Sequence, residues 1–180
     1  MDNLPHYPWF GIAGGSDDVQ QGDILRRCPL FFPTTIDLDD PQARSEFSWE
    51  KRDVIVMSQS CDLVKGRGSD GDKEVLLCVL LKPSELGTNP LATKDGLNGL
   101  RSGKRPAFHL LNEIDIQGYT SEVSIVSFQH IRSLPLTFVR QQAQHQLHPR
   151  LLPPYREHLS QAFARYFMRV GLPVAIPEFR

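Results

Sequence analysis

The segment Glu74–Lys82 constrains the fold most, because seven consecutive residues within it (Val-Leu-Leu-Cys-Val-Leu-Leu) are apolar. Successive side chains of a strand point to opposite faces, so a strand of this composition must be covered on both. It is therefore predicted to be central in a sheet. Four further strands are expected at Asp23–Phe32, Asp53–Gln59, Arg105–Leu111 and Glu122–Phe128. Gly118 is expected to form a turn between the last two.

Three helices are expected. A short one covers Lys94–Leu100 behind Thr93 as its N-cap, and a second runs from Ser133 to about Gln142. The clearest begins at Pro153 and Pro154 and ends at Gly171. Its apolar residues at helical spacing are Tyr155, Leu159, Ala162, Phe163, Tyr166, Phe167 and Val170. This face is expected to cover the sheet, with a dimer contact as the alternative.

Short strands, long loops and a C-terminal amphipathic helix predict an α+β domain built on a small antiparallel β-barrel. We expect a single domain over residues 1–180. It would have an irregular N-terminal arm at 1–21, a barrel core at 22–132 and a helical extension at 133–180. The acidic stretch 35–50 is expected to be an exposed loop anchored by Phe47 and Trp49.

Composition excludes several classes of protein. A net charge of −1 and a pI near 6.6 give no general attraction to nucleic acid or acidic lipid, so RNA binding would need a local basic patch. No apolar run approaches the roughly 18 residues of a membrane helix, and the N-terminus lacks the pattern of a signal peptide. We therefore expect a cytoplasmic protein without a membrane partner. Cys28, Cys61 and Cys78 form no Cys-x-x-Cys pair and fit that compartment.

The stretch Arg52–Val64 carries the densest set of reactive groups. An apolar strand runs directly into Ser58, Gln59, Ser60, Cys61 and Asp62. Functional groups are often placed where a rigid strand enters a loop, so this is the first candidate site.

Cys61 could act as a nucleophile if a histidine lowered its pKa, and His109 and His130 are the available bases. Asp62 or Glu113 could orient such a histidine. The alternative is structural: Cys61 packs in a turn and Asp62 caps it through the backbone.

Metal binding by Cys61, Asp62 and one histidine is a further alternative, and His145 and His148 lie in a Gln-rich segment. The spacing is not that of a known metal site, so no metal and no cofactor are predicted.

A local basic cluster offers a site for RNA, in a groove that follows phosphates and stacks a base on Phe108 or His109. The predicted nucleic-acid-binding residues are Lys94, Arg101, Lys104, Arg105 and Arg132, with Arg140 and Arg150 further on. The alternative is a solvated loop face balanced by the acidic tract at 37–50.

Three segments resemble the MazF/PemK family of toxins. Gly22-Asp23-Ile24 and the strand Arg52–Ser58 are similar to the opening of that barrel, and Ser124–Leu134 is similar to its closing strand. The resemblance implies an SH3-like, PemK-like barrel, a homodimer, an antitoxin partner and RNA cleavage without a metal. Arg52 would take the place of the family's loop arginine.

The chain also departs from that pattern. Asp53 replaces the usual proline, and Ser84 is only a loose substitute for the hydroxyl residue expected after the third strand. The stretch Ser58–Asp62 and the C-terminal helix lie outside the pattern. We therefore expect a barrel relative with its own site.

The predicted function is that of a bacterial-type small barrel protein that binds RNA or cleaves it without a metal. The candidate catalytic residues are Arg52, Ser58, Cys61, His109 and His130. Two alternatives are a non-catalytic protein-interaction module of a toxin–antitoxin, phage or defence system, and a Cys-dependent hydrolase.

Overall fold

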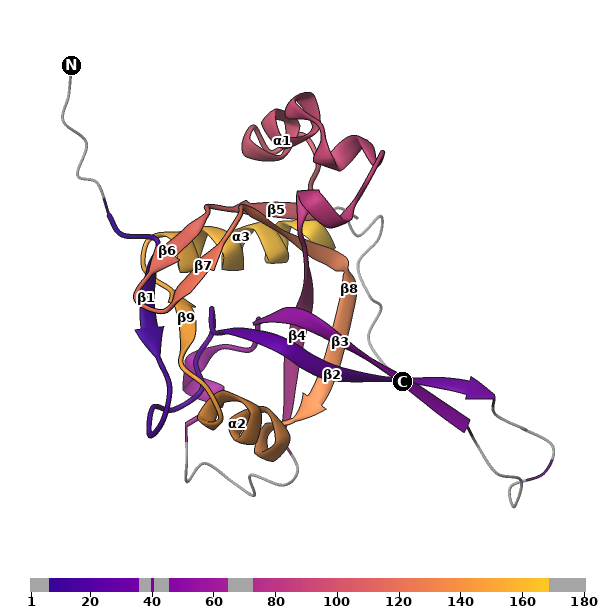
Figure 1. Ribbon diagram of the computed structural model, residues 1–180, viewed down its shortest axis with the longest axis vertical. Helices are drawn as coiled ribbons and strands as arrows, with labels where there is room; N and C mark the ends of the chain where they lie inside the picture. Colours follow the sequence, from indigo (N-terminus) through magenta and orange to yellow (C-terminus); the bar gives the residue numbers. More distant parts are fainter. Residues whose placement is uncertain (1–6, 36–39, 41–45, 65–72, 169–180) are drawn as a thin grey trace, which may run out of the picture.

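The computed structural model describes residues 7–35, 40, 46–64 and 73–168, and these form an α+β fold (Figure 1). Its strands are β1 Phe10–Ala13, β2 Ile24–Thr35, β3 Glu46–Val56, β4 Glu74–Leu81, β5 Phe108–Leu111, β6 Ile114–Ile116, β7 Tyr119–Ser121, β8 Ser124–Pro135 and β9 His148–Leu151. Its α-helices are α1 Lys94–Arg101, α2 Leu136–Gln144 and α3 Tyr155–Phe167. Short 3-10 turns are η1 Ser60–Asp62, η3 Pro83–Glu85 and η4 Pro90–Ala92.

Strand β4 lies at the centre of an antiparallel sheet in the order β2-β3-β4-β8-β5. Val75, Leu77 and Val79 of β4 pack into one core, and Cys78 and Leu80 pack into another on the opposite face. The prediction of a central strand is confirmed, and it is buried on both faces from Leu77 to Leu80, while Leu76 is 41% exposed.

Two helices cover these faces, with α2 low in Figure 1 and α3 high. Leu136, Val139 and Ala143 of α2 complete the first core, and Leu159 of α3 belongs to the second. The Phe163 ring meets Phe128 of β8 edge-on, with 5.3 Å between centroids. The C-terminal helix is confirmed as a cover of the sheet from Tyr155 to Phe167, while Val170 and Gly171 lie outside the described residues.

The N-terminal segment is not irregular throughout. Strand β1 lies within it and pairs with β9, with Phe10 opposite Leu151 and both side chains buried. Strands β6 and β7 form a hairpin whose turn contains Gly118 at φ 76°, so the turn is confirmed although its two strands were not predicted. Helix α1 also follows the prediction, since the Thr93 hydroxyl caps it by accepting the Gly96 amide at 3.0 Å.

The barrel expected from the sequence is not closed by the described strands. Edge strands β2 and β5 are not paired with each other, so the five-stranded sheet stays open. Strand β8 is irregular: Cys78 lies opposite Ile131, but the next residue, Val79, lies opposite Ser127. The three residues between them, 128–130, therefore form a bulge, which bends a strand. Residues 133–135 continue this strand, so the predicted start of a helix at Ser133 is wrong.

Strands β2 and β3 are longer than predicted and project as a two-stranded ribbon at the right of Figure 1. Pro33 does not end β2, because an edge strand tolerates a residue without an amide hydrogen. Phe47 and Trp49 belong to β3 and are 64% and 58% exposed, so they do not anchor a loop. Strand β5 in turn begins only at Phe108. No helix in the described part of the chain is long and apolar enough to cross a membrane.

We predict that Leu159→Ala lowers the free energy of unfolding by about 2–5 kcal/mol, because a fully buried leucine would leave a cavity under α3. Urea denaturation measures the change. Met168→Ala, at a residue 76% exposed just after α3, is the matched control and should change stability by less than about 0.5 kcal/mol. Equal effects of the two substitutions would contradict docking of α3 on the sheet.

Candidate functional site

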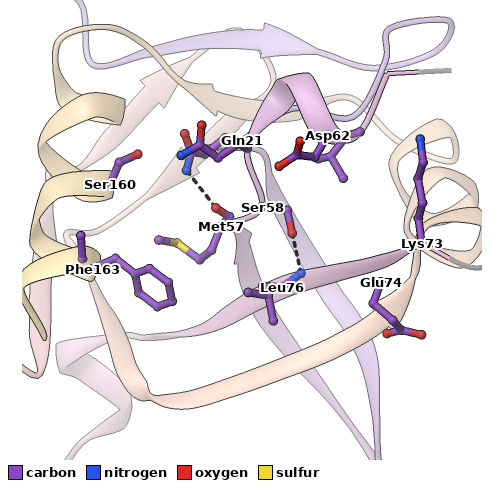
Figure 2. A pocket seen from close by; sticks show the side chains of 12 residues that line it. Gln21, Met57, Ser58, Asp62, Lys73, Glu74, Leu76, Ser160 and Phe163 are labelled. Atoms are coloured by element: carbon purple, nitrogen blue, oxygen red, sulfur yellow. Dashed lines mark hydrogen bonds between the residues drawn. The ribbon is translucent and has the colours of Figure 1, made fainter. Parts of the chain in front are cut away.

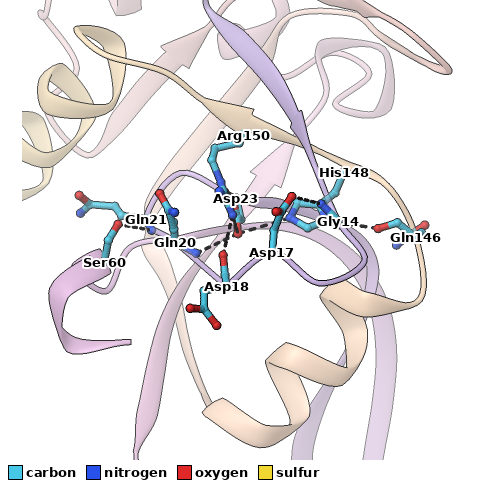
Figure 3. Close-up of polar contacts among 10 residues, drawn as sticks. All are labelled: Gly14, Asp17, Asp18, Gln20, Gln21, Asp23, Ser60, Gln146, His148 and Arg150. Carbon is cyan, nitrogen blue, oxygen red and sulfur yellow. Dashed lines mark hydrogen bonds and ion pairs between the residues drawn. The ribbon is translucent and has the colours of Figure 1, made fainter. Parts of the chain in front are cut away.

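The two serines of the 58–62 stretch bind backbone groups where β3 leaves the sheet, as Figure 2 shows for Ser58 and Figure 3 for Ser60. Ser58 Oγ accepts the Leu76 amide at 2.8 Å, and Ser60 Oγ accepts the Gln21 amide at 3.1 Å. The Gln21 side chain in turn donates to the Met57 carbonyl at 2.8 Å. These side chains satisfy polar groups that the end of the strand ladder leaves open.

A cleft of about 670 Å³ lies beside this stretch, between it, the start of β4 and α3. Met57, Leu76 and Phe163 form its apolar part, with Asp62 and Lys73 among its polar residues. Figure 2 shows Ser160 and Phe163 reaching it from α3. The lining contains no histidine, so Ser58 has no imidazole base beside it.

Cys61 is exposed in η1, with its Sγ 3.7 Å from Asp62 Oδ1. The recess around it is lined by Asp18, Val19, Gln20, Ser60 and Val64, without a histidine. The other two thiols are buried, and burial raises the pKa of Cys28 to about 11 and that of Cys78 to about 12. Cys61 is thus the accessible thiol, but the predicted Cys–His pair is not assembled there.

His130 and His109 lie elsewhere. His130 is exposed in the β8 bulge, where its Nδ1 is 2.8 Å from Ser127 Oγ. Ser127 is fully buried, so this Ser–His pair cannot present its hydroxyl to a substrate. His109, on β5, lines a separate cavity beside His158.

The five candidate catalytic residues are therefore not brought into one site. Arg52 lines a cleft that none of the other four reaches, and Ser58, Cys61 and His109 each line a different one. Among the described residues, no group of three or more histidine, cysteine or acidic side chains could hold a metal ion.

The predicted nucleic-acid-binding residues are only partly assembled. Lys104 and Arg105 line one cleft of about 720 Å³ beside α1. Arg101 faces the cavity of His109, and Lys94 is exposed at the start of α1. Arg132 lies on β8 with its guanidinium 4.9 Å from the centre of the Phe32 ring, and no contact joins it to the others.

A second concentration of positive charge lies at the root of the β2–β3 ribbon. A cleft of about 340 Å³ is lined there by basic side chains from β2, from β3 and from the residue that follows β4: Arg26, Arg27, Lys51, Arg52 and Lys82. Of these only Arg52 was a sequence candidate. We call this group the basic cleft.

Asp53 organises the basic cleft. The register of β2 against β3 slips between Leu25 and Cys28, so Arg26 and Arg27 form a bulge, with Arg27 at φ 50°. Asp53 Oδ1 accepts the Arg27 amide at 2.9 Å, and Asp53 Oδ2 lies 3.0 Å from Lys82 Nζ. An aspartate where the toxin pattern has proline thus holds the bulge and one lysine in place.

The acidic neighbours of Lys82 and Arg52 favour the charged forms of these two side chains. Burial would lower the pKa of Lys82, but its hydrogen bond to Asp53 and the nearby Glu85 raise it above the ordinary 10.5. Arg52 donates a hydrogen bond to the Glu50 carboxylate at 2.8 Å, and this contact raises the pKa of Arg52. The sequence signal was present in two basic doublets, Arg26-Arg27 and Lys51-Arg52. Only the pairing of β2 with β3 shows that they are neighbours.

Asp23 lies at the centre of a buried network that ties the N-terminal loop to β9 (Figure 3). It is fully buried and accepts hydrogen bonds from the Arg150 guanidinium and, at 2.9 Å, from the Gln20 amide. His148 Nε2 lies 3.3 Å from Asp23 Oδ2 and is poorly aligned for a hydrogen bond. His148 is thus in a strand, not in the Gln-rich loop where the sequence placed it.

No protein-family model matches this sequence, and no curated protein is significantly similar to it. The function has to be argued from the geometry of the chain itself.

We predict that Asp23→Asn lowers the free energy of unfolding at pH 7 by about 3 kcal/mol, because it removes one charge of a buried pair. Burial alone would raise the pKa of Asp23, but the contacts with His148, Arg150 and the Gln20 amide lower it below 3.8. Its contribution is therefore complete above pH 3.8 and is lost as the pH falls through the lower pKa of the folded state.

Urea denaturation at pH 7 and at several values below pH 4 tests this, with Asp115→Asn, an exposed position, as the control. The stability difference between wild type and Asp23→Asn should shrink only in the acid range. A difference that is absent at pH 7, or unchanged in acid, would show that the carboxylate does not stabilise the fold.

Proposed function

We propose that the protein binds single-stranded RNA at the basic cleft and along the β2–β3 ribbon. The observation that carries this is the convergence of five cationic side chains around one cleft, against Asp53 and Glu85 in its lining and Glu50 paired with Arg52. Phosphates supply most of the affinity of nucleic-acid binding, so a local excess of positive charge is the first requirement. A chain with a net charge of −1 meets it only in such a patch.

Exposed aromatic side chains next to the cleft support the proposal. Phe31 and Trp49 are directly opposite each other on the ribbon, so their side chains share a face. They are 55% and 58% exposed, and Lys51 of the basic cleft lies 5.6 Å from the Trp49 ring. Aromatic faces that stack on bases beside a cationic groove are typical of single-strand binding.

The same proposal includes a relation to the SH3-like barrels of the MazF/PemK type. Its support is the succession of antiparallel strands, the Gly22-Asp23-Ile24 opening and the bent strand β8, which pairs with both β4 and β5. RNA binding at the basic cleft does not require cleavage. Arg52 belongs to this cleft, whereas Ser58 lies in another.

We predict that Arg26→Gln with Lys51→Gln weakens binding of a fluorescein-labelled single-stranded RNA and reduces its salt dependence. Each lost phosphate contact should reduce the slope of log K against log salt by about 0.7. Fluorescence anisotropy measures both quantities. Lys104→Gln with Arg105→Gln removes the same charge from the cleft beside α1 and should leave binding within about twofold of wild type. A greater loss of affinity in this control pair would place the RNA-binding site at the basic cluster predicted from the sequence.

We predict that Trp49→Ala weakens the same binding by about 1–3 kcal/mol, because one base would lose its stacking partner. Trp49→Phe keeps an aromatic face and should retain most of the affinity. The thermal unfolding midpoint should not fall in either variant, since the side chain is exposed.

The labelled RNA also separates the alternatives. Cleavage that persists with a chelator and is lost in Arg52→Ala would extend the proposal from binding to catalysis. Wild-type protein that binds neither RNA nor single-stranded DNA would overturn it and would favour a protein-interaction module.

A further inference from the structure

A cavity of about 340 Å³ lies between the end of α1, strand β5 and the start of α3. It shares no residue with the basic cleft or with the cleft beside Ser58. Its volume falls in the range of small-molecule sites. The walls come from Leu100, Leu110, Leu111 and Val123, so most of the interior is apolar.

Four polar residues line this apolar cavity: half-buried His109 from β5, and three exposed residues, Arg101 from α1, Asn112 just after β5 and His158 from α3. Within the described residues, none of the four makes a hydrogen bond or ion pair with another side chain. None of the residues that line the cavity is acidic. An apolar pocket with a few convergent polar groups and no internal counterion is the arrangement that fixes a ligand in one orientation.

The charged state of the lining residues determines which ligand charge fits the cavity. Burial, together with the nearby His158, lowers the pKa of His109 to about 4, so this ring is neutral at pH 7. A neutral imidazole offers one donor and one acceptor without adding charge. Arg101 is permanently charged and presents paired donors that match a carboxylate. A monoanion therefore fits better than a phosphate dianion.

One wall is rigid and aromatic. The rings of Trp9 and Tyr155 stack in parallel, with 3.7 Å between their centroids and 8° between their planes, and His158 meets Tyr155 edge-on. Strand β5 is the edge of the sheet, so among the described strands nothing pairs with its outer side. The ligand would lie between this aromatic wall and the leucine side chains.

We propose that this cavity binds a small aromatic or aliphatic carboxylate, with its carboxylate on Arg101 and its apolar body among the leucine side chains. This is a second binding site, independent of the RNA-binding proposal because no residue is shared. His109 and Asn112 would act as hydrogen-bonding partners that set the orientation.

Benzoate and benzamide, which have nearly the same shape, test the proposal. Chemical-shift titration by NMR at pH 7 should show benzoate moving the ring signals of His109 and His158, with an affinity at least tenfold above that of benzamide. Arg101→Gln should remove this preference, and Arg105→Gln should keep it, because Arg105 faces the neighbouring cleft. A tenfold preference corresponds to about 1.4 kcal/mol.

Val123→Trp gives a second check, since a larger side chain would fill the cavity and abolish the shifts while the rest of the spectrum stays native. Three outcomes would overturn the proposal: no saturable shift with benzoate up to about 10 mM, equal affinity for the two probes, or a preference that survives Arg101→Gln.

Discussion

Burial of β4 on both faces is the constraint on which the rest of the fold depends. A strand with Leu77 on one side and Cys78 on the other cannot face water on either, because exposed apolar area costs about 25 cal/mol per Å². The chain supplies the two covers from its last third, α2 for one face and α3 for the other. Residues 136–167 therefore close both faces of the core and are not an appendage to a finished barrel.

Polar residues at the end of a strand can form a reactive site or can hydrogen-bond to the backbone, and their sequence alone does not distinguish the two roles. Ser58 and Ser60 lie in a stretch with the composition of a reactive site, yet their hydroxyls accept hydrogen bonds from the backbone amides of Leu76 and Gln21. The basic cleft is the reverse case, because its residues do not look like one site in the sequence. Its arginines and lysines look like scattered surface charge until the β2 bulge and Asp53 bring them together.

The sequence predicted what depends on local pattern. The continuous apolar run of β4, the Thr93 cap of α1 and the apolar face of α3 each involve residues within a few positions of one another. Strands β1 and β9 escaped prediction because each is four residues long and each has the other as its partner in a two-stranded sheet. The arrangement of the site could not be predicted from the sequence because it also depends on contacts between distant residues. Whether Arg52 lies beside Ser58 or beside Arg26 is decided by strand register, which no short stretch encodes.

The Asp23–Arg150 pair has a consequence for synthesis of the chain. The two residues are 127 positions apart, so at about 5–20 residues per second the carboxylate waits roughly 6–25 s for its partner to leave the ribosome. Over that interval β1 also lacks β9, and α3 has not yet been made. The emerging chain can form the β2–β3 ribbon, but the ion pair of Asp23 cannot form until β9 has been translated. Residues 148–167 therefore complete the core and pair with the N-terminal strand β1 in the same stage of synthesis.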